Sequence, residues 1–403
     1  MERVISSEAP ATTTTGLISV IVPTYKEVDN LRPLVERIAA TMTAEGRHYE
    51  IVVVDDNSRD GTEGVMAELA AAGFPARLVT RVNQRGLSSA VIEGFRQARG
   101  EILVCMDADL SHPPEALGQL IVPVETAGAD FVIGSRYVRG GGTEEGWGLF
   151  RWLNSKVATL MARPFTSARD PMAGFFALPR AVFERADSLS PIGYKIGLEL
   201  IVKCRCRNVR EVPIHFANRK FGQSKLSLRE QINYIKHLKR LADYKYGWFS
   251  HLAQFCLVGV TGALVDLGTY KLLIVKLLAP LERALLATFP TGSFLADHAA
   301  GEALTLVAGL AIWVAMTWNF FLNRRLTFSH SRGGNALRQY WQFVVACSLG
   351  ALVNLGIRVS LPAIIPFFNH YKLLAGAVGI VAGTVFNFAL SHHWVFRRQE
   401  TRE

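Results

Sequence analysis

Short hydrophobic runs alternate with amphipathic segments over the first part of the chain. Four runs have the length and apolar character of strands: Leu17–Val22, Glu50–Val54, Arg77–Thr80 and Ile102–Met106. Three segments between them place apolar residues at helical spacing: Asn30–Met42, Thr62–Ala72 and Leu87–Ala98. Strands buried on both faces and separated by helices are typical of a parallel sheet covered by helices. The pattern predicts a doubly wound α/β domain over residues 17–226. Residues 1–16 lack the apolar core of a signal peptide and are expected to be disordered.

Polar clusters follow three of these strands: Pro23–Asn30, Asp55–Thr62 and Asp107–Pro114. In parallel sheets, ligands bind beyond the carboxyl ends of the strands. We therefore expect the three clusters to share one binding site at that edge of the sheet.

The chain changes character after residue 226. Residues 227–250 place apolar side chains at helical spacing among Lys and Arg, which is typical of helices at a membrane surface. Four apolar segments then follow, each long enough to span a bilayer: Leu252–Leu278, Ala303–Leu322, Trp341–Ile365 and Leu373–Trp394. They predict an all-α membrane domain of four transmembrane helices over residues 251–397, with residues 398–403 as a tail. Arginines after the second and fourth segments place both termini and the first domain in the cytoplasm of a multi-pass protein of the cell membrane.

An internal repeat runs through the apolar segments. The matching parts are Gly262–Gly268 with Gly350–Gly356, and Asn319-Phe320 with Asn387-Phe388. The repeat predicts two duplicated helical hairpins. Asp266 and Arg358 are ionisable residues within apolar segments, where a charge normally has a partner. We expect these two side chains to approach each other between the hairpins.

The net charge indicates the class of partner, and the cysteine pattern indicates whether disulfides are expected. The formal charge of +10 favours anionic partners such as phosphates or lipid headgroups. Lys and Arg gather beside the apolar segments without forming a basic stripe with interleaved aromatic residues, so nucleic acid is not expected. The five cysteines are odd in number and irregularly spaced, which favours free thiols over a disulfide framework.

Asp107 and Asp109 are the first candidates for chemistry. Alternate carboxylates at the end of a strand can approach one cation, and oxygen ligands suit Mg²⁺ or Mn²⁺ bound to a diphosphate. Pro, Tyr and the paired carboxylates after the first two strands can stack on and hydrogen-bond a nucleobase and ribose: Pro23, Tyr25, Asp55 and Asp56. Gly86 forms a turn before a helix and can cradle a phosphate.

With these motifs, residues 17–226 resemble glycosyltransferase family 2, and within it the dolichyl-phosphate mannose synthases. The matching motifs include Gly86-Leu-Ser-Ser-Ala90, Met106-Asp-Ala-Asp-Leu110, Ile133-Gly-Ser-Arg-Tyr137, Asp170-Pro-x-x-Gly-Phe-Phe176 and Gly222-x-Ser-Lys225. The apolar segments resemble a GtrA-type membrane domain. The resemblance implies a GT-A type nucleotide-sugar-binding fold. It also implies inverting transfer of a sugar, mannose from GDP-mannose, to a dolichyl or polyprenyl phosphate.

The resemblance also implies roles for individual residues. The nucleotide-sugar site would comprise Pro23, Tyr25, Glu27, Val54, Asp55, Asp56, Gly86, Asp107, Arg219 and Lys225. The metal site would comprise Asp107, Asp109 and Ser111, the acceptor-phosphate site Arg136, Arg151 and Ser155, and the catalytic set Asp109, Arg136, Arg151 and Asp170. A lipid phosphate is already an anion, so it needs no general base, and Asp170 would position groups instead. Glu199 and Lys195 fall in a predicted helix, and they either take part in the site or have only a structural role.

Departures from the family pattern leave alternatives open. Ser111 replaces the usual Gln, Lys220-Phe221 replaces a stretch that often holds a second Arg, and Ala173 replaces Ser. The alternatives are a glucosyltransferase that uses UDP-glucose, and a flippase or transport module for lipid-linked sugars with a nucleotide-sensing domain. A processive polysaccharide synthase fits less well, because Gly148 stands where its Gln-x-x-Arg-Trp motif needs Gln.

Overall fold

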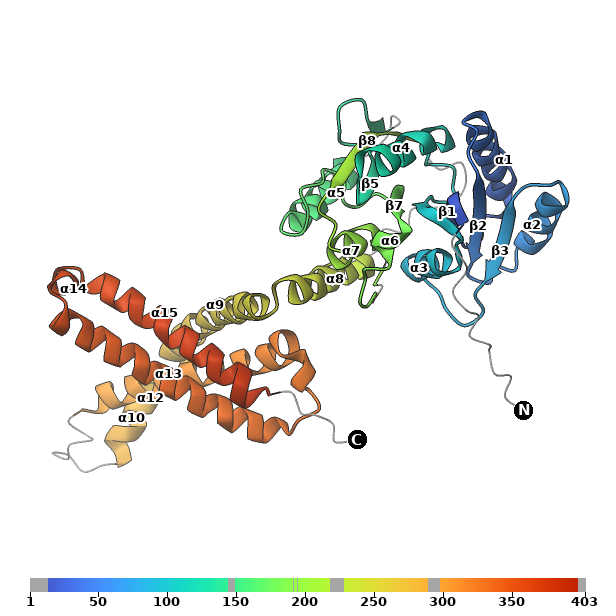
Figure 1. The fold of residues 1–403 in the computed structure, drawn as a ribbon. Coiled ribbons are helices and arrows are strands. Elements are labelled where there is room, and N and C mark those ends of the chain that lie inside the picture. The colour runs from blue at the N-terminus through green and yellow to red at the C-terminus, as the bar shows by residue number, and fades with distance from the viewer. Residues whose placement is uncertain are drawn as a thin grey trace, which may run out of the picture. The chain divides into compact units, whose positions relative to one another are not determined.

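The computed structural model describes residues 14–143, 149–190, 192–193, 195–217, 228–288 and 298–397. Two compact units make up the chain, Met1–Lys245 and Tyr246–Glu403. The first contains the mixed sheet and the second the long apolar helices (Figure 1). Arg219 and Lys225, two of the predicted donor-site residues, lie outside the described residues.

A seven-stranded sheet in the order β3-β2-β1-β4-β7-β5-β8 forms the centre of the first unit. Its strands are β1 (Thr14–Thr24), β2 (Tyr49–Asp55), β3 (Ala76–Thr80), β4 (Gly100–Cys105), β5 (Phe131–Ser135), β7 (Phe176–Pro179) and β8 (Val209–Pro213). Two short strands, β6 (Gly142–Thr143) and β9 (His215–Phe216), pair separately. The four strands expected from the sequence coincide with β1 to β4, except that the fourth was expected to end at Met106, one residue after β4 ends, and these strands pair in parallel.

The expectation of an all-parallel sheet is wrong at β7, which runs antiparallel to both β4 and β5. Cys105 at the end of β4 pairs with Phe176 at the start of β7. As a consequence, the residues before Phe176 lie beside those after Cys105, at the carboxyl end of β4. The reversed strand therefore brings the Asp170–Phe175 segment to the edge of the sheet where ligands are expected.

Helices cover both faces of this sheet. The helices of this unit are α1 (Val28–Ala44), α2 (Thr62–Ala71), α3 (Leu87–Gln97), the short η1 (Pro114–Ala116), α4 (Leu117–Ala127), α5 (Leu149–Ala162), α6 (Arg180–Phe183), α7 (Ile196–Lys203) and α8 (Leu228–Tyr246), of which α5 and α8 pack with α7. One hydrophobic core joins α1, α2 and α4 to the sheet, and another joins α3, α6 and α7 to its opposite face. The predicted three-layer α/β architecture is confirmed, with a mixed sheet in place of a parallel one.

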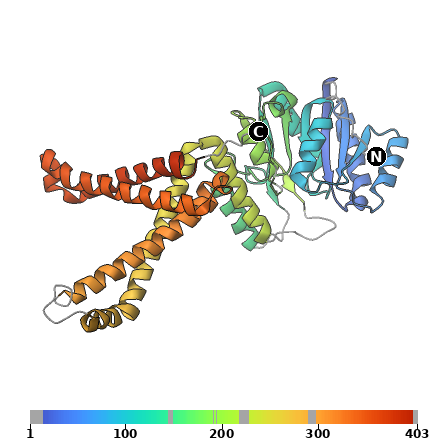
Figure 2. The same ribbon diagram turned by 90° about the horizontal axis from the view of Figure 1, so that it is seen from below.

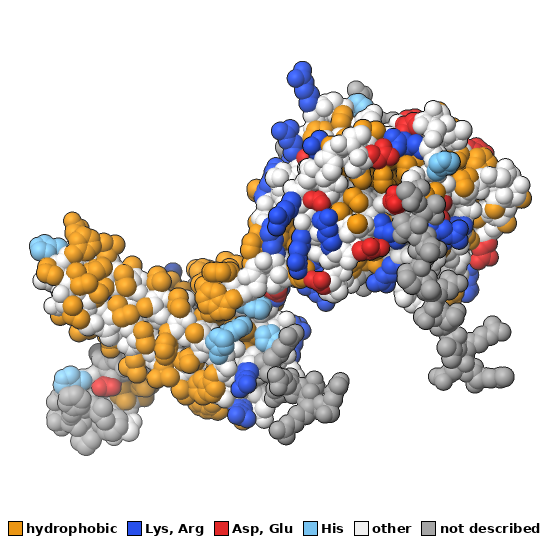
Figure 3. Space-filling view, viewed as in Figure 1, with side chains coloured by type: hydrophobic (Ala, Val, Ile, Leu, Met, Phe, Trp, Pro, Cys, Tyr) orange, Lys and Arg blue, Asp and Glu red, His pale blue; other side chains and the backbone are white. Residues whose placement is uncertain are grey.

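The second unit contains four candidate membrane spans: Trp248–Thr288, Gly301–Thr327, Ala336–Ile364 and Lys372–Val395. Its elements are α9 (Trp248–Leu273), η2 (Ile274–Leu278), α10 (Ala279–Thr288), α12 (Ala299–Leu322), η3 (Asn323–Thr327), η4 (Ser329–Ser331), α13 (Ala336–Ile364), α14 (Pro366–His370), α15 (Lys372–Leu390) and η5 (Ser391–Val395). α9 packs against α12 and α13 against α15, and both views show these two pairs side by side (Figures 1 and 2). Hydrophobic side chains dominate the visible face of this unit, as expected for a surface that contacts lipid (Figure 3).

Both pairs of helices show the same close contact. A Cβ atom at Gly262 would lie 2.2 Å from Oδ1 of Asn319, and one at Gly350 would lie 1.8 Å from Oδ1 of Asn387. Glycine at such crossings lets helices approach closely in a membrane. Each pair also ends in a π-helical turn, η3 after α12 and η5 after α15.

The expected ion pair between Asp266 and Arg358 is not formed. Neither residue takes part in an ion pair within the described part of the chain. Arg358 instead lies near α15 of its own hairpin, with Nε 4.0 Å from the place a Cβ atom would occupy at Gly376. Asp266 lies in α9 and Arg358 in α13, which belong to different hairpins, and the sequence repeat does not determine how the two hairpins pack.

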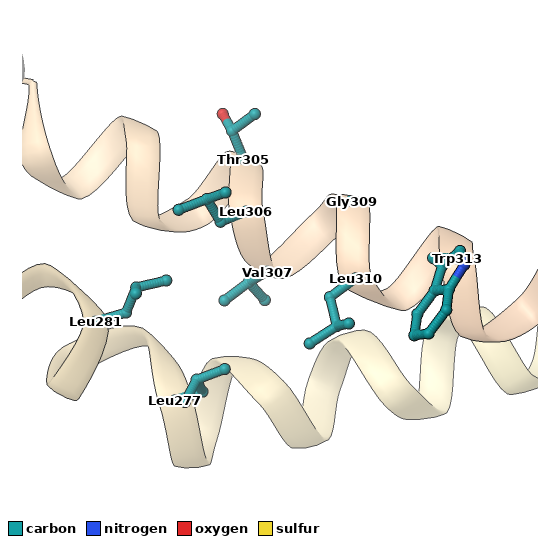
Figure 4. A pocket seen from close by; sticks show the side chains of 8 residues that line it. All are labelled: Leu277, Leu281, Thr305, Leu306, Val307, Gly309, Leu310 and Trp313. Carbon is teal, nitrogen blue, oxygen red and sulfur yellow. The ribbon is translucent and has the colours of Figure 1, made fainter.

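An apolar pocket of about 490 Å³ lies between α12 and the segment formed by η2 and α10 (Figure 4). Leu277 and Leu281 face Val307 and Leu310 across it, and Thr305 is its one hydroxyl residue. The Thr305 hydroxyl donates to the carbonyl oxygen of Gly301 in its own helix, at 2.9 Å. The indole N–H of Trp313 is the other polar side-chain group of this lining, which contains no ionisable side chain. Candidate groups for chemistry are therefore sought in the first unit.

Candidate active site

Asp107 and Asp109 lie directly beyond the end of β4. Asp109 is buried, and its Oδ1 accepts hydrogen bonds from the backbone N–H of Ser111, at 3.1 Å, and from the Ser111 hydroxyl. Leu110 adopts a φ of 60°, in the left-handed region, which turns the chain sharply enough for this contact. Ser111, predicted as a metal ligand, donates both of these hydrogen bonds, and its ligation of a metal stays a prediction.

His112 holds Asp107 from the same loop. The backbone N–H of Asp107 donates to Nδ1 of His112 at 3.0 Å, and His112 Nε2 lies 3.9 Å from Asp107 Oδ2. The imidazole stacks on Phe175, with ring centroids 5.1 Å apart, and meets the edge of Phe216. Burial lowers the pKa of His112, although the Asp107 and Asp109 carboxylates oppose that effect. A neutral ring that accepts at Nδ1 carries its proton on Nε2, facing the Asp107 carboxylate.

Gly174 lies against the same carboxylate. A Cβ atom there would lie 3.2 Å from both oxygens of Asp107 and 3.4 Å from the His112 ring. The site therefore has room for glycine but little for any larger residue. This contact is a direct result of the antiparallel β7, and it joins two motifs that lie more than sixty residues apart in the sequence.

The two carboxylates fit a particular kind of metal. Among the residues that the structure describes, no group of three or more His, Cys, Asp and Glu side chains is arranged to hold a metal ion. The Asp107 side chain is 26% exposed, so it can reach a bound ion. Two hard carboxylates at an open edge suit a cation such as Mg²⁺, whose remaining positions are taken by diphosphate and water.

Arg136 and Asp170 form a bidentate ion pair. Nε and Nη2 of Arg136 each donate to an oxygen of Asp170 at 2.8 Å, and the Arg136 backbone N–H donates to Oδ2 at 3.1 Å. Asp170 is fully buried, and β8 fixes its backbone because Glu211 accepts the N–H groups of Arg169 and Asp170. Burial opposes the charge of Arg136, but the hydrogen bonds and charge of Asp170 outweigh that effect and raise its pKa. Both oxygens of Asp170 thus hold Arg136 in place.

Two aromatic rings fix the orientation of Arg136. Its guanidinium lies 5.3 Å from the ring centres of Phe216 and Tyr137. Since Phe216 also contacts His112, the arginine and the Asp107 loop share one aromatic wall. The Tyr137 hydroxyl lies 2.7 Å from Oγ of Ser155 in α5, so Tyr137 contacts both Arg136 and Ser155, two of the predicted acceptor-site residues. Arg151 belongs to the first turn of α5, and its side chain lies outside the described residues.

The predicted nucleotide residues gather at the ends of β1 and β2. Pro23 pairs with Val54 and Thr24 with Asp55 in the parallel ladder. Oδ2 of Asp55 accepts the N–H of Ser58 at 2.8 Å, which shapes the loop after β2. The guanidinium of Arg85 lies 5.0 Å from the ring centre of Tyr25. Glu27 accepts a hydrogen bond from the Asn30 side chain at 2.7 Å.

Arg81 is a residue of this region that sequence reasoning missed. Its Nε donates to Oδ1 of Asp56 at 2.8 Å, while Oδ2 of Asp56 accepts the N–H of Gly86 at 2.8 Å. Gly86 has a φ of 129°, which favours glycine. The Asp56 carboxylate therefore joins the loop after β2 to the turn before α3. The position of Arg81, directly after the predicted third strand, was the available signal.

Lys195 lies in the electrostatic field of Arg136, Asp170 and Asp107. Burial, and then repulsion from Arg136, lower its pKa to about 7. Glu199, which the sequence left open, is instead paired with Lys203, with Oε1 2.8 Å from Nζ. It contacts none of the residues described above.

An α/β domain with a predicted nucleotide site, an acidic strand end and a fixed arginine has the features of a nucleotide-sugar-dependent glycosyltransferase. The model of the family "Glycosyl transferase family 2" matches residues 19–186, and that of the "GtrA/DPMS, transmembrane domain" matches residues 254–396. A dolichol-phosphate mannosyltransferase of Pyrococcus furiosus is 37% identical over 380 residues, which cover 93% of this chain and 98% of that protein. The enzyme of the same name from Saccharomyces cerevisiae is 42% identical over 237 residues, covering 57% of this chain and 88% of its own.

The chain belongs to glycosyl transferase family 2, among the dolichol-phosphate mannosyltransferases that carry a GtrA/DPMS transmembrane domain. Glucosyl-3-phosphoglycerate synthase from Mycobacterium tuberculosis is a distant solved structure, 21% identical with a TM-score of 0.43 over 57% of this chain and 80% of that one. That likeness is too weak to support a functional argument.

Proposed function

We propose that the protein transfers mannose from GDP-mannose to a dolichyl or polyprenyl phosphate, with inversion at the anomeric carbon. The observation that carries this proposal is the convergence of the Asp107 loop and the Arg136–Asp170 pair on one aromatic wall. One side of that wall can hold a donor diphosphate and the other an acceptor phosphate. The names of the relatives supply the sugar and the acceptor.

The donor would bind along the ends of β1, β2 and β4. We assign the nucleotide to Pro23, Tyr25, Glu27, Val54, Asp55, Asp56 and Gly86, and the diphosphate to Arg219 and Lys225 with Asp107. Mg²⁺ or Mn²⁺ held by Asp107 and Asp109 would neutralise the charge that develops on the leaving diphosphate. Ser111 serves this site through its hydrogen bonds to Asp109.

The acceptor phosphate would bind at Arg136, Arg151 and Ser155. Guanidinium groups suit phosphate oxygens because they donate two parallel hydrogen bonds. A phosphate monoester is already an anion and can attack the anomeric carbon without a general base. Asp170, whose oxygens both hold Arg136, then acts as a positioning residue. Catalysis rests on alignment of the two substrates and on charge neutralisation.

The four candidate membrane spans support a reaction at a lipid surface. We propose that the first unit and both termini lie in the cytoplasm, because Arg324, Arg325 and Arg397 lie at the ends of spans on the side of the termini. A lipid phosphate acceptor would then present its headgroup to the enzyme from the same membrane.

A transfer assay with the full-length protein tests the proposal. It would combine GDP-mannose or UDP-glucose with a polyprenyl phosphate and Mg²⁺ or Mn²⁺. The expected product is an acid-labile mannolipid formed from GDP-mannose, and lost in Asp109→Asn. If a glucolipid forms from UDP-glucose and no mannolipid forms from GDP-mannose, the donor is UDP-glucose. Absence of a glycolipid with every donor, or full activity of Asp109→Asn, would overturn the enzymatic role.

A further inference from the structure

A second pocket, lined mainly by polar side chains, lies between α7 and α8 within the first unit. It has a volume of about 210 Å³, and its polar lining includes Glu199, Lys203, His237, Arg240 and Tyr244. None of the side chains assigned above to the donor, metal or acceptor lines it. Leu198 and Val202 of α7 pack on Leu238 and Leu241 of α8, so the two walls are held together by a hydrophobic contact.

Two buried polar atoms in this pocket have no hydrogen-bond partner among the described residues: Oε2 of Glu199 and Nε2 of His237. Both side chains are almost fully buried, with Glu199 1% and His237 2% exposed. The other oxygen of Glu199 is satisfied by the Ser190 N–H at 2.7 Å and the Lys203 ammonium at 2.8 Å. Buried polar atoms are nearly always paired, so an unpaired acceptor and an unpaired ring nitrogen in one cavity point to a bound group.

The charges around the pocket select an anion. Glu199 is the one carboxylate in the lining, against the cationic Lys203 and Arg240. His237 adds a further donor, with Nδ1 4.0 Å from Glu199 Oε2. A metal cation would be repelled by this balance. An oxyanion can accept from Arg240, Lys203 and His237, whereas Glu199 Oε2 needs a donor, which a hydroxyl group on the same ligand supplies.

We propose that this pocket binds a phosphoryl oxyanion that also carries a hydroxyl group. Two sources have this chemistry: the inorganic phosphate monoanion, and a lipid headgroup in which a phosphodiester is linked to glycerol. The pocket stands close to a membrane span along the chain, because α8 ends at Tyr246 and α9 begins at Trp248. The site is independent of the donor and acceptor sites proposed above.

The test uses the full-length protein in phosphatidylcholine nanodiscs. In one arm, the unfolding temperature is measured with inorganic phosphate and, as a control, with sodium chloride at the same ionic strength. In the other arm, phosphatidylglycerol is included, and the lipid retained per protein is counted by native mass spectrometry. Arg240→Gln removes an exposed guanidinium of the pocket. Lys236→Gln is the matched control, on an exposed position of α8 outside the lining.

Ser155→Ala separates this pocket from the acceptor-phosphate site, because it removes an acceptor-site hydroxyl without leaving a buried charge unpaired. We expect Arg240→Gln to weaken binding at least tenfold, while Lys236→Gln and Ser155→Ala retain it. Retention of phosphatidylglycerol without stabilisation by phosphate identifies a lipid headgroup as the ligand, and stabilisation by phosphate identifies the free anion. The proposal is overturned if Arg240→Gln binds like Lys236→Gln, if only Ser155→Ala loses binding, or if the wild type binds neither ligand.

Discussion

Arg136 holds the buried carboxylate of Asp170 by two parallel hydrogen bonds of 2.8 Å. The pair connects β5 with the segment that leads into β7, so it serves both the fold and the proposed acceptor site. We expect that breaking it affects stability and activity together, whereas a change at an exposed pair elsewhere in the first unit affects neither strongly.

Asp170→Asn should destabilise the first unit by about 3–5 kcal/mol, because it leaves a buried guanidinium without its counter-charge. The unfolding temperature and kcat/KM for the acceptor would both fall. Arg185→Gln is the control, since Arg185 pairs with Asp130 on the surface and is 51% exposed. An exposed pair contributes about 0–1 kcal/mol. Equal losses in the two variants would contradict the role given to Asp170.

Gly174→Ala should lower activity about 10- to 100-fold, because the added methyl group displaces the Asp107 carboxylate. The concentration of Mn²⁺ needed for half-maximal activity should rise with it, which a general loss of structure would not cause. Gly64→Ala, in α2, is the matched control, because a Cβ atom at Gly64 meets nothing within 4 Å. An unchanged metal requirement in Gly174→Ala would show that the close contact has no functional consequence.

Gly350→Ala should destabilise the second unit by about 1–3 kcal/mol, since its methyl group would overlap Oδ1 of Asn387. The unfolding temperature in detergent is expected to fall by several degrees. Gly356→Ala lies in the same helix, where a Cβ atom would meet nothing within 4 Å, and it should leave that temperature nearly unchanged. Similar unfolding temperatures for both variants would show that the helices do not need this close crossing.

Lys195 should make stability depend on pH. Burial, then repulsion from Arg136, lower its pKa in the folded protein to about 7, below its ordinary value of 10.5. Above pH 7 the unfolded chain therefore binds one more proton at this site, so the stability of the wild type rises with pH by up to about 1.4 kcal/mol per unit. Lys195→Met removes this rise, and Lys156→Met, at an exposed position of α5, keeps it. Unfolding temperatures measured from pH 7 to 9 test the difference, and parallel curves for wild type and Lys195→Met would refute it.

The sequence predicted secondary structure correctly where apolar residues recur in a regular pattern. Alternation of apolar runs and amphipathic segments predicted β1 to β4 and the helices between them, and long apolar segments predicted the membrane spans. The reversed direction of β7 was not predictable, because four residues contain no directional pattern and pairing partners lie far away in sequence. The Arg81–Asp56 contact joins residues 25 positions apart, and no local rule pairs them. Motifs therefore indicated the site residues, whereas the contacts of Gly174, His112 and Arg81 required the structure.

The strand order also has a consequence for the time at which the enzyme becomes functional during synthesis. β4 and β5 follow each other in sequence, but β7 lies between them in the sheet. The ribosome must therefore release residues 176–179 before β7 can join β4 to β5, and it must release Phe216 as well before the Asp107 loop and Arg136 can meet across that ring. A nascent chain that ends before β7 would contain the proposed nucleotide site but an incomplete acceptor site, so we expect that the two substrates cannot be brought together on an unfinished protein.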